Sequence, residues 1–280
     1  MSKRSVVITG ASKGIGEATA LHLDRLGFHV FAGVRSDEDA VRLQEQASER
    51  ITPVILDVTD ETSIELAAAA VRDSGPHDML GLVNNAAISA PGPLEFVPLE
   101  EFRAQLEVNL VGSLAVTQAL LPHIRSATDR RLVNVSSING RLAWRYIGPY
   151  IASKHALEGL SDTFRMELAR WNIHVSVVQP GAIDTPIFQT SRERGREVIQ
   201  EYPERARQLY SGVMYSIMER EGRAPGHALP PERVARVIAK ALTARRPKTR
   251  YIVGWDARLG IFLRHILPDR AIDWLMERAH

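Results

Sequence analysis

"SVVITGASKGIGEATALHLDRLG", residues 5–27, places a β-branched run directly before a glycine-rich turn and a helical pattern. Glycines at 10, 14 and 16 permit positive φ and let the backbone approach a ligand closely. The first N–H groups of the following helix attract negative charge, so such a turn suits a pyrophosphate. A strand, this turn and a helix in the first βα unit therefore predict a dinucleotide-binding site.

Beyond this unit, short apolar runs alternate with amphipathic stretches along most of the chain. We expect strands near residues 5–9, 29–34, 52–56, 79–83, 131–136, 173–178 and 250–253, with helices between most of them. Nearly continuous apolar runs are typical of parallel strands that are covered on both faces. The pattern predicts a single α/β domain over residues 1–280, built on a Rossmann-type, doubly wound, seven-stranded parallel sheet with helices on both faces.

Two segments interrupt this alternation. Residues 186–229 form a long polar and aromatic insertion without a clear regular pattern, and segments of this kind are usually functional or disordered. Residues 256–280 form an extension after the last strand, in which arginines 258 and 264 flank an apolar stripe at helical spacing, Leu259, Phe262, Leu263, Ile266 and Leu267. Such a stripe can contact a membrane surface, its own domain or a neighbouring subunit.

Composition excludes several classes of protein. The formal charge of the 280 residues is only +2, and the short basic clusters at 192–196 and 244–250 lack a stacking platform, which argues against a nucleic-acid partner. There is no cysteine, and the nine histidines show no metal-ligand spacing, so we expect no metal site. A strand pattern follows "MSKR" directly, and no apolar run reaches the ~18 residues of a membrane span. We expect a cytoplasmic protein.

The segment "RYIGPYIASKHA" contains Tyr146, Tyr150 and Lys154 at intervals of four residues. Hydride transfer at a carbonyl requires a proton to move at the oxygen, and a free phenol with a pKa near ~10 does this poorly at neutrality. A cation one helical turn away favours the phenolate, so Lys154 should lower the pKa of Tyr150. Pro149 predicts that the helix begins after Tyr146. We therefore expect Tyr150 to be the acid/base residue.

Motifs along the chain resemble those of the short-chain dehydrogenase/reductase family. In order, they are "TGASKGIG" at 9–16, "DV" at 57–58, "NNAA" at 84–87, Asn109 in "VNLVG", "NVSS" at 134–137, "YIASK" at 150–154 and "PGAIDT" at 180–185. The resemblance covers nearly the whole chain. One departure is Ala87, where the family usually has glycine.

This resemblance implies four catalytic residues, Asn109, Ser137, Tyr150 and Lys154. Ser137 would hold the substrate oxygen and offset its developing charge. Ser136 is the alternative, although strand alternation directs it to the opposite face. Lys154 would bond the nicotinamide ribose, and Asn109 would bind a water that links the lysine to solvent.

The resemblance also implies a set of cofactor-binding residues. They are Thr9, Gly10, Ser12, Lys13, Gly14, Ile15, Gly16, Arg35, Asp57, Val58, Asn84, Ala86, Tyr150, Lys154, Pro180, Gly181, Ile183 and Thr185. Asp57 would bond the adenine amine and Thr185 the nicotinamide carboxamide.

The end of the second strand favours NADP(H) over NAD(H). An NAD-specific site usually has an acid there for the ribose 2′-OH, and by resemblance this position falls on Val34. Arg35 follows, and Lys13 in the glycine turn can reach the same corner. Two cations fit a 2′-phosphate. Both could instead be solvated surface charges, and Asp37 lies close by.

Members of the family usually have a mobile lid at the position of residues 186–229. Its aromatic residues, with apolar residues before Tyr150, predict a pocket for a lipophilic secondary alcohol or ketone of steroid or retinoid size. We expect the pocket to be lined by Ser137, Leu142, Trp144, Tyr150, Phe188, Tyr210 and Met214. The alternative is that the aromatics pin the lid to the domain. Three stretches, residues 101–125, 148–162 and 245–251, resemble the subgroup that includes steroid and retinol dehydrogenases, which likewise favours lipophilic substrates.

Two other functions fit part of the pattern. Arginines 192, 194 and 196 leave open a reductase of 3-oxoacyl thioesters, which needs a cationic groove for a phosphopantetheine carrier. A non-catalytic NADP(H) sensor is disfavoured by the four catalytic residues. Tetrameric members usually end soon after the last strand, so the extension favours a homodimer built on helices near 107–125 and 150–170.

Overall fold

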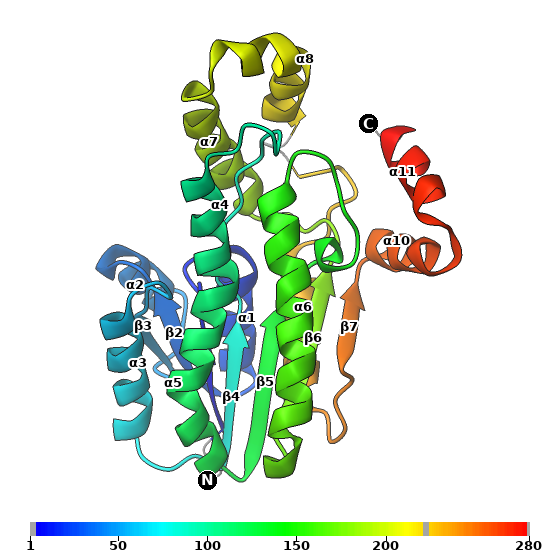
Figure 1. Ribbon diagram of the computed structural model, residues 1–280. Coiled ribbons are helices and arrows are strands. Elements are labelled where there is room, and N and C mark those ends of the chain that lie inside the picture. Colours follow the sequence, from blue (N-terminus) through cyan, green and yellow to red (C-terminus); the bar gives the residue numbers. More distant parts are fainter. Residues whose placement is uncertain (1–3, 221–223, 279–280) are drawn as a thin grey trace.

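The computed structural model describes residues 4–220 and 224–278 and contains a seven-stranded sheet (Figure 1). Its strands are β1 (Arg4–Ile8), β2 (His29–Val34), β3 (Ile51–Ile55), β4 (Met79–Asn84), β5 (Asp129–Val135), β6 (His174–Pro180) and β7 (Arg250–Val253). All neighbours are parallel, in the order β3-β2-β1-β4-β5-β6-β7. The predicted doubly wound Rossmann-type sheet is confirmed.

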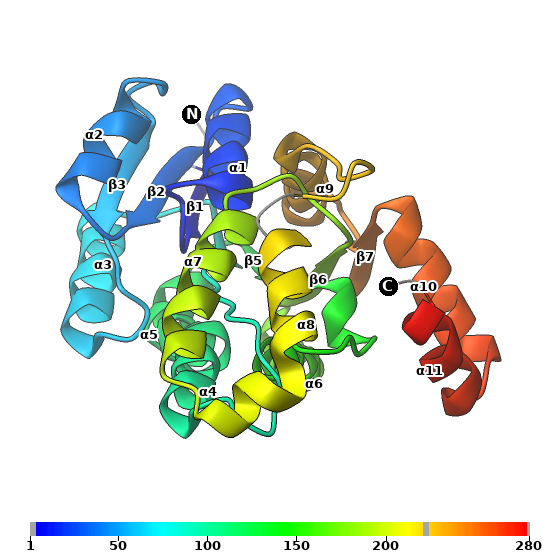
Figure 2. The same ribbon diagram turned by 90° about the horizontal axis from the view of Figure 1, so that it is seen from above.

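Helices cover both faces of the sheet (Figure 2). One face carries α1 (Gly14–Arg25), α2 (Asp37–Gln44) and α9 (Pro231–Thr243), and the other carries α3 (Glu61–Asp73), α5 (Gly112–Ser126) and α6 (Gly148–Leu168). Leu23 and Ile238 belong to the core on the first face, and Leu120 and Phe164 to the core on the second. Because both faces are covered, β4 is buried along its whole length.

The order of the strands determines where a ligand can bind. The chain winds outward from β1 in one direction to β2 and β3, and in the other direction to β4 and the remaining strands. Loops that leave neighbouring β1 and β4 therefore diverge and leave a crevice at their carboxyl ends. The glycine turn follows β1, and the "NNAA" loop follows β4.

A π-helical turn interrupts the long helix on the second face. The helix α4 (Leu99–Leu106) runs through this turn, Glu107–Val111, into α5. Single π-helical turns inside helices are frequent at functional sites, because they redirect a side chain that a regular helix would place elsewhere. The predicted catalytic Asn109 lies in this turn.

Residues 187–220, which we call the lid, stand above the carboxyl ends of the strands (Figure 1). The expectation that this segment lacks regular structure was wrong, because it folds as α7 (Ile187–Gln200) and α8 (Glu204–Arg220). Tyr202 and Ala206 are its buried centre, and they pack with Phe96, Ile199 and Tyr210. The apolar partners of the lid helices thus include a residue from a distant loop.

The extension after β7 also folds as helices, α10 (Trp255–Ile266) and α11 (Asp269–Arg278). Of the α10 side chains, Ala257 and Ile261 are buried. An α10 outer face of Trp255, Leu259, Phe262 and Ile266 is instead 48–61% exposed. Part of the predicted apolar stripe therefore faces away from the domain. Within the described residues, no helix has the length and apolarity needed to cross a bilayer.

Candidate active site

The glycine turn after β1 has the geometry of an anion cradle. Gly10 and Gly14 have φ of 64° and 61°, a region that favours glycine. At Gly16 a Cβ would lie 2.0 Å from the carbonyl oxygen of Gly10, so no other residue fits. Lys13, the N-cap residue of α1, makes no side-chain cap hydrogen bond, which leaves the first N–H groups of the helix for a ligand. The turn therefore fits the pyrophosphate of a dinucleotide.

The loop after β4 is tied to this turn. Thr9 Oγ1 accepts hydrogen bonds from the N–H groups of Asn85 and Ala86 at 2.9 and 3.0 Å. The Asn85 side chain donates to the carbonyls of Thr9 and Gly10, both at 3.0 Å. Both sides of the crevice are thus held at a set separation. Ala87 is not among the described residues with positive φ, so the missing glycine causes no backbone strain.

Asn84 has a role inside the fold. It is 3% exposed, and its amide donates to Thr117 on α5 and to Asn134 on β5, each at 2.9 Å. Asn134 in turn donates to Ser161 on α6 at 2.8 Å. The structure therefore places the side chain of Asn84 among strands and helices. Asn85, which was not among the predicted cofactor-binding residues, faces the glycine turn instead.

Asn109 connects the same loop to α6. Its side chain accepts from the N–H of Ile88 at 2.8 Å and donates to the carbonyl of Ile88 at 2.9 Å. It also donates to Ser153 at 3.0 Å, next to Lys154 in the chain. Asn109 is fully buried. The π-helical turn thus brings this amide to the segment that carries the predicted acid/base pair.

Ser137 and Tyr150 lie together at the start of α6. Ser137 is 8% exposed, and its hydroxyl accepts from the N–H of Asn139 at 3.1 Å. Burial raises the pKa of Tyr150 to about 12, and a hydrogen bond with Ser137 opposes this shift. The helix begins at Gly148 with Pro149 in its first turn, so Tyr146 precedes it as expected.

Lys154 is buried one helical turn after Tyr150. Its ammonium lies 5.6 Å from the centre of the Tyr150 ring and donates to the carbonyl of Val135 at 3.0 Å. Burial lowers the pKa of Lys154 to about 8, and the charge of Glu158 opposes this. The expectation that Lys154 lowers the pKa of Tyr150 is not supported, because desolvation raises this pKa and the opposing effect comes from the hydrogen bond with Ser137.

The "PGAIDT" segment reaches the glycine turn from the other side of the crevice. A Cβ on Gly14 would lie 3.2 Å from the side chain of Thr185, so the two segments touch. Ile183 is buried and pairs with Leu229 after the lid. Pro180 ends β6, and the N–H of Gly181 donates to Val253 at 2.8 Å.

Asp256 of α10 supports this segment, and no sequence motif pointed to it. Its carboxylate accepts from the N–H of Ala182 at 2.8 Å. A Cβ on Gly181 would lie 2.2 Å from Asp256 Oδ2, so the carboxylate fills the space beside the turn. The C-terminal extension therefore contributes directly to the site.

The end of the crevice that is predicted to hold the adenine half of the dinucleotide contains Lys13, Val34 and Arg35. Lys13 and Arg35 are exposed, and Val34 is buried. Arg42 of α2 is an additional cation that sequence reasoning missed. It donates to the carbonyl of Ser12 and pairs with Glu17 at 3.1 Å. Arg42 thus braces the glycine turn from outside.

The remaining residues of this end are placed by local contacts. Asp57 accepts from the N–H and hydroxyl of Thr59 at 2.9 and 2.7 Å. Val58 is buried against Gly112, where a Cβ would lie 2.7 Å from the valine side chain. Ile15 packs on the core of the first face.

Residues predicted to line the substrate pocket fall into two groups. Tyr210 of the lid stacks edge-on with Tyr146 at 6.5 Å and donates to Glu95 at 3.0 Å. Tyr146 has a φ of 66°, and such strain in a non-glycine residue often marks a functional site. Leu142, by contrast, is buried against α10, where a Cβ on Gly260 would lie 2.7 Å away.

Three other residues were predicted to line the pocket. Phe188 on α7 and Trp144 are half-buried. The side chain of Met214 lies outside the described residues. Because Tyr202 and Tyr210 contact Phe96, at least part of the lid aromatics pin the lid to the domain.

A dinucleotide cradle beside a buried serine and lysine and a half-buried tyrosine is the arrangement expected of a nicotinamide-dependent oxidoreductase. The chain belongs to the short-chain dehydrogenase/reductase family, because the family model for short chain dehydrogenase matches residues 4–196. It is similar to retinol dehydrogenase 5 of Homo sapiens, with 35% identity over 99% of this chain and 90% of that protein. Human 17-beta-hydroxysteroid dehydrogenase type 6 is also 35% identical, over 100% and 89%. The uncharacterized oxidoreductase YusZ of Bacillus subtilis is 36% identical over 99% of both chains.

Solved structures support the same family. A short chain dehydrogenase from Burkholderia cenocepacia in complex with NADP superimposes with a TM-score of 0.74 and is 26% identical, over 99% of this chain and 97% of that one. A 3-ketoacyl-(acyl-carrier-protein) reductase from Brucella melitensis complexed with NADH has a TM-score of 0.73 and is 25% identical, over 91% and 98%. Both nicotinamide cofactors therefore occur among similar structures.

Proposed function

We propose that this enzyme transfers hydride between NADP(H) and a lipophilic secondary alcohol or ketone of steroid or retinoid size. The observation that carries the proposal is the cluster of buried Ser137 and Lys154 with half-buried Tyr150 beside a glycine turn that fits a dinucleotide. Relatives named as retinol and 17-beta-hydroxysteroid dehydrogenases, each 35% identical over nearly the whole chain, support the substrate class.

Each residue of the cluster has a distinct task in this proposal. A bound nicotinamide would supply or accept the hydride. With a pKa of about 12, Tyr150 is protonated at neutrality and can donate its proton to a carbonyl oxygen. The hydroxyl of Ser137 would hold the same oxygen. The ammonium of Lys154 would stabilise the phenolate left behind.

The test is a screen for NADPH consumption with steroids, retinoids, aliphatic ketones and 3-oxoacyl thioesters. We expect Tyr150→Phe to lower kcat/KM by about 10²–10⁴-fold while NADPH still binds. Tyr146→Phe is the matched control, since Tyr146 precedes the helix, and it should stay within a few-fold. If NADPH binds, no carbonyl is reduced and Tyr150→Phe changes nothing, the protein is a sensor.

The thioester reductase remains the second candidate, supported by the arginines of the lid. Arg194 is bound by both oxygens of Glu101 at 2.9 and 3.0 Å and is therefore engaged within the domain. This leaves a weaker cationic groove than the sequence implied. Higher kcat/KM on 3-oxoacyl thioesters than on free ketones would favour this candidate.

For the cofactor we propose that Arg35 and Lys13 bind the 2′-phosphate of NADP(H). Both are exposed at the end of β2 and in the glycine turn, and no acid occupies the position of Val34. Arg35→Glu should raise the KM for NADPH about 10–100-fold and change the KM for NADH far less. Arg25→Glu, at the opposite end of α1, is the charge-matched control. An unaltered NADPH KM in Arg35→Glu contradicts the proposal.

We further propose a homodimer formed through α5 and α6. Met166 on α6 and Val111 before α5 are 67% and 42% exposed, as expected of a surface that a partner covers. Met166→Glu should shift the sedimentation coefficient to that of a monomer.

We also propose peripheral membrane contact through the α10 outer face. Phe262→Asp should abolish co-sedimentation with phosphatidylcholine vesicles. The cytoplasmic location stays a prediction.

A further inference from the structure

A row of ionisable side chains continues along α6 beyond the proposed acid/base pair. After Tyr150 and Lys154, Glu158 and Asp162 follow at further steps of four residues, so all four lie along one side of the helix. Lys154 and Glu158 are only 2% and 5% exposed. A buried carboxylate is costly unless it is paired and hydrogen-bonded, and the proposed reaction does not use Glu158.

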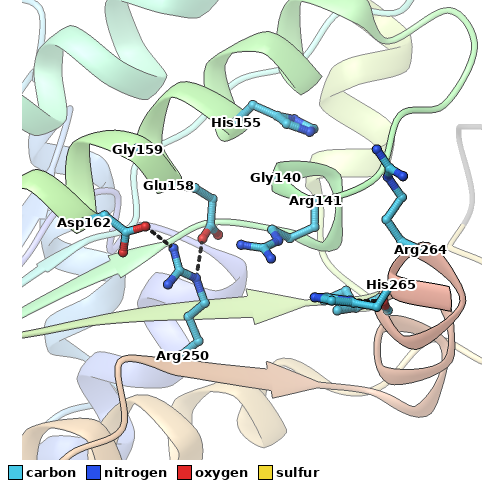
Figure 3. A pocket seen from close by; sticks show the side chains of 10 residues that line it. Gly140, Arg141, His155, Glu158, Gly159, Asp162, Arg250, Arg264 and His265 are labelled. Carbon is cyan, nitrogen blue, oxygen red and sulfur yellow. Dashed lines mark hydrogen bonds and ion pairs between the residues drawn. The ribbon is translucent and has the colours of Figure 1, made fainter. Parts of the chain in front are cut away.

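Both oxygens of Glu158 are occupied by groups from neighbouring strands. Gln179 of β6 donates to Oε1 at 2.9 Å, and Arg250 of β7 donates to Oε2 at 2.9 Å. The same guanidinium donates to Asp162 at 2.8 Å, and Figure 3 shows it reaching between the two carboxylates. Glu158 is therefore held in one position, and it is held as an anion.

If the more exposed Arg165 is left out of the count, the charges of this cluster balance when Lys154 is included. Glu158 and Asp162 contribute −2 and Arg250 +1, so the three together carry −1. The ammonium of Lys154 brings the sum to zero. Arg165 pairs with the outer oxygen of Asp162, where both side chains are about one-third exposed and solvent screens the pair.

We propose that Glu158 is a positioning residue that keeps the ammonium of Lys154 charged, with Gln179 and Arg250 holding its carboxylate. The 138–140 turn packs against this stretch of α6, since a Cβ on Gly140 would lie 3.0 Å from Glu158 Cγ and 3.1 Å from the backbone carbonyl oxygen of Lys154. In agreement with this proposal, the charge of Glu158 raises the pKa of Lys154, whereas burial lowers it. The consequence for turnover rests on the proposed function, whereas the charge state of Lys154 does not.

Other ionisable groups face Glu158 from the elements around it. A cavity of about 470 Å³ borders it, between α6, β7, α10 and the 138–141 turn (Figure 3). The charged or titratable residues of its lining, apart from Glu158, are Arg141, His155, Asp162, Arg250, Arg264 and His265. On the other side Lys154 faces Tyr150, which is neutral at pH 7 because its pKa is about 12.

The direct test measures the protonation of Lys154 without any substrate. The chain has five lysines, Lys3, Lys13, Lys154, Lys240 and Lys248, so labelling with [¹³Cε]lysine gives a simple NMR spectrum in which each ammonium can be titrated. We expect the wild-type midpoint of Lys154 near pH 8. Glu158→Gln should lower it by about one pH unit or more.

Asp162→Asn is the matched control, because it also removes a carboxylate bound to Arg250 but lies one turn farther from Lys154. Its midpoint should stay within about 0.3 of the wild type. The proposal is overturned if Glu158→Gln leaves the midpoint unchanged or if Asp162→Asn lowers it equally.

Turnover supplies the second readout. The alkaline limb of the kcat/KM profile should follow the Lys154 midpoint, so Glu158→Gln should move this limb to lower pH while the rate near pH 6 stays close to wild type. A merely structural role would lower the rate equally at every pH and would overturn the proposal. If the NMR shift occurs but no carbonyl is reduced, the proposed function fails and the pairing of Glu158 with Lys154 stands.

Discussion

Lys154 is a buried cation, and its charge works against the stability of the fold. Burial lowers its pKa from 10.5 to about 8. Between these values the unfolded chain binds more protons than the folded one, so stability rises with pH across this window. Below pH 8 the buried charge lowers the free energy of unfolding by its full amount, on the order of 3 kcal/mol for a pKa shift of this size. The residue therefore destabilises the protein in the pH range in which its charge is useful.

Lys154→Met should accordingly stabilise the protein at neutral pH while it abolishes activity. We expect the free energy of unfolding at pH 6.5 to rise by about 1–3 kcal/mol, less what the lost hydrogen bond to Val135 contributed. The gain should shrink as pH rises from 8 to 10.5. Urea unfolding followed by circular dichroism at three pH values measures this. Lys240→Met, an exposed lysine on α9, should change stability by less than about 0.5 kcal/mol. A variant less stable than wild type at pH 6.5 would contradict the account.

At the scale of the element, α10 supports the cofactor side of the crevice. Asp256 in its first turn binds the N–H of Ala182, and Gly181 and Gly254 leave room for its carboxylate. Gly254 has a φ of 110°, which a residue with a side chain rarely adopts. The extension after β7 is therefore coupled to the "PGAIDT" segment, and through Thr185 to the glycine turn.

Asp256→Ala should weaken NADPH binding by about 10–100-fold, because a hydrogen bond to a charged group that orders the segment is lost. Fluorescence titration with NADPH measures the Kd. Asp269→Ala is the control, since Asp269 also lies in the extension but is 78% exposed and pairs with Arg264 at 2.7 Å. Equal Kd values in the two variants would show that α10 does not support the site.

At the scale of the whole molecule, the ion pair between Arg194 and Glu101 joins the lid to the domain. Glu101 of α4 is only 8% exposed, and both of its oxygens accept from Arg194 of α7. Gln105 donates to the same carboxylate at 2.9 Å and to the carbonyl of Ala90 at 3.3 Å. Removal of Arg194 would leave a buried, unpaired charge, which is strongly destabilising for the contact.

Arg194→Met should therefore loosen the lid without unfolding the sheet. We expect amide hydrogen exchange in α7 to become at least about tenfold faster, while the strands exchange as in the wild type. Mass spectrometry of peptides from residues 187–200 gives the readout. Arg207→Met is the matched control on α8, because Arg207 pairs with Glu204 at 3.8 Å on an exposed surface. Exchange that is equally fast in both variants would exclude a special role for the Arg194–Glu101 pair.

The doubly wound parallel sheet and the glycine turn followed from the sequence because their signals are local. Apolar runs mark each strand, and three glycines within seven residues mark a turn that only glycine can form at positions such as Gly16. The start of α6 was likewise predictable, since Pro149 favours a first helical turn. Each of these features depends on residues that are neighbours in the chain.

Contacts between distant segments were decided by the tertiary structure alone. Asp256 meets Ala182 across 74 residues, and Arg42 meets Ser12 across 30, so no motif records either contact. The lid helices escaped detection because part of their packing partner, Phe96, comes from another loop. The pKa of Tyr150 was likewise decided by the tertiary structure. Spacing along α6 shows that a cation is near, but only the folded molecule shows how much water is excluded, and desolvation determines the sign of the shift.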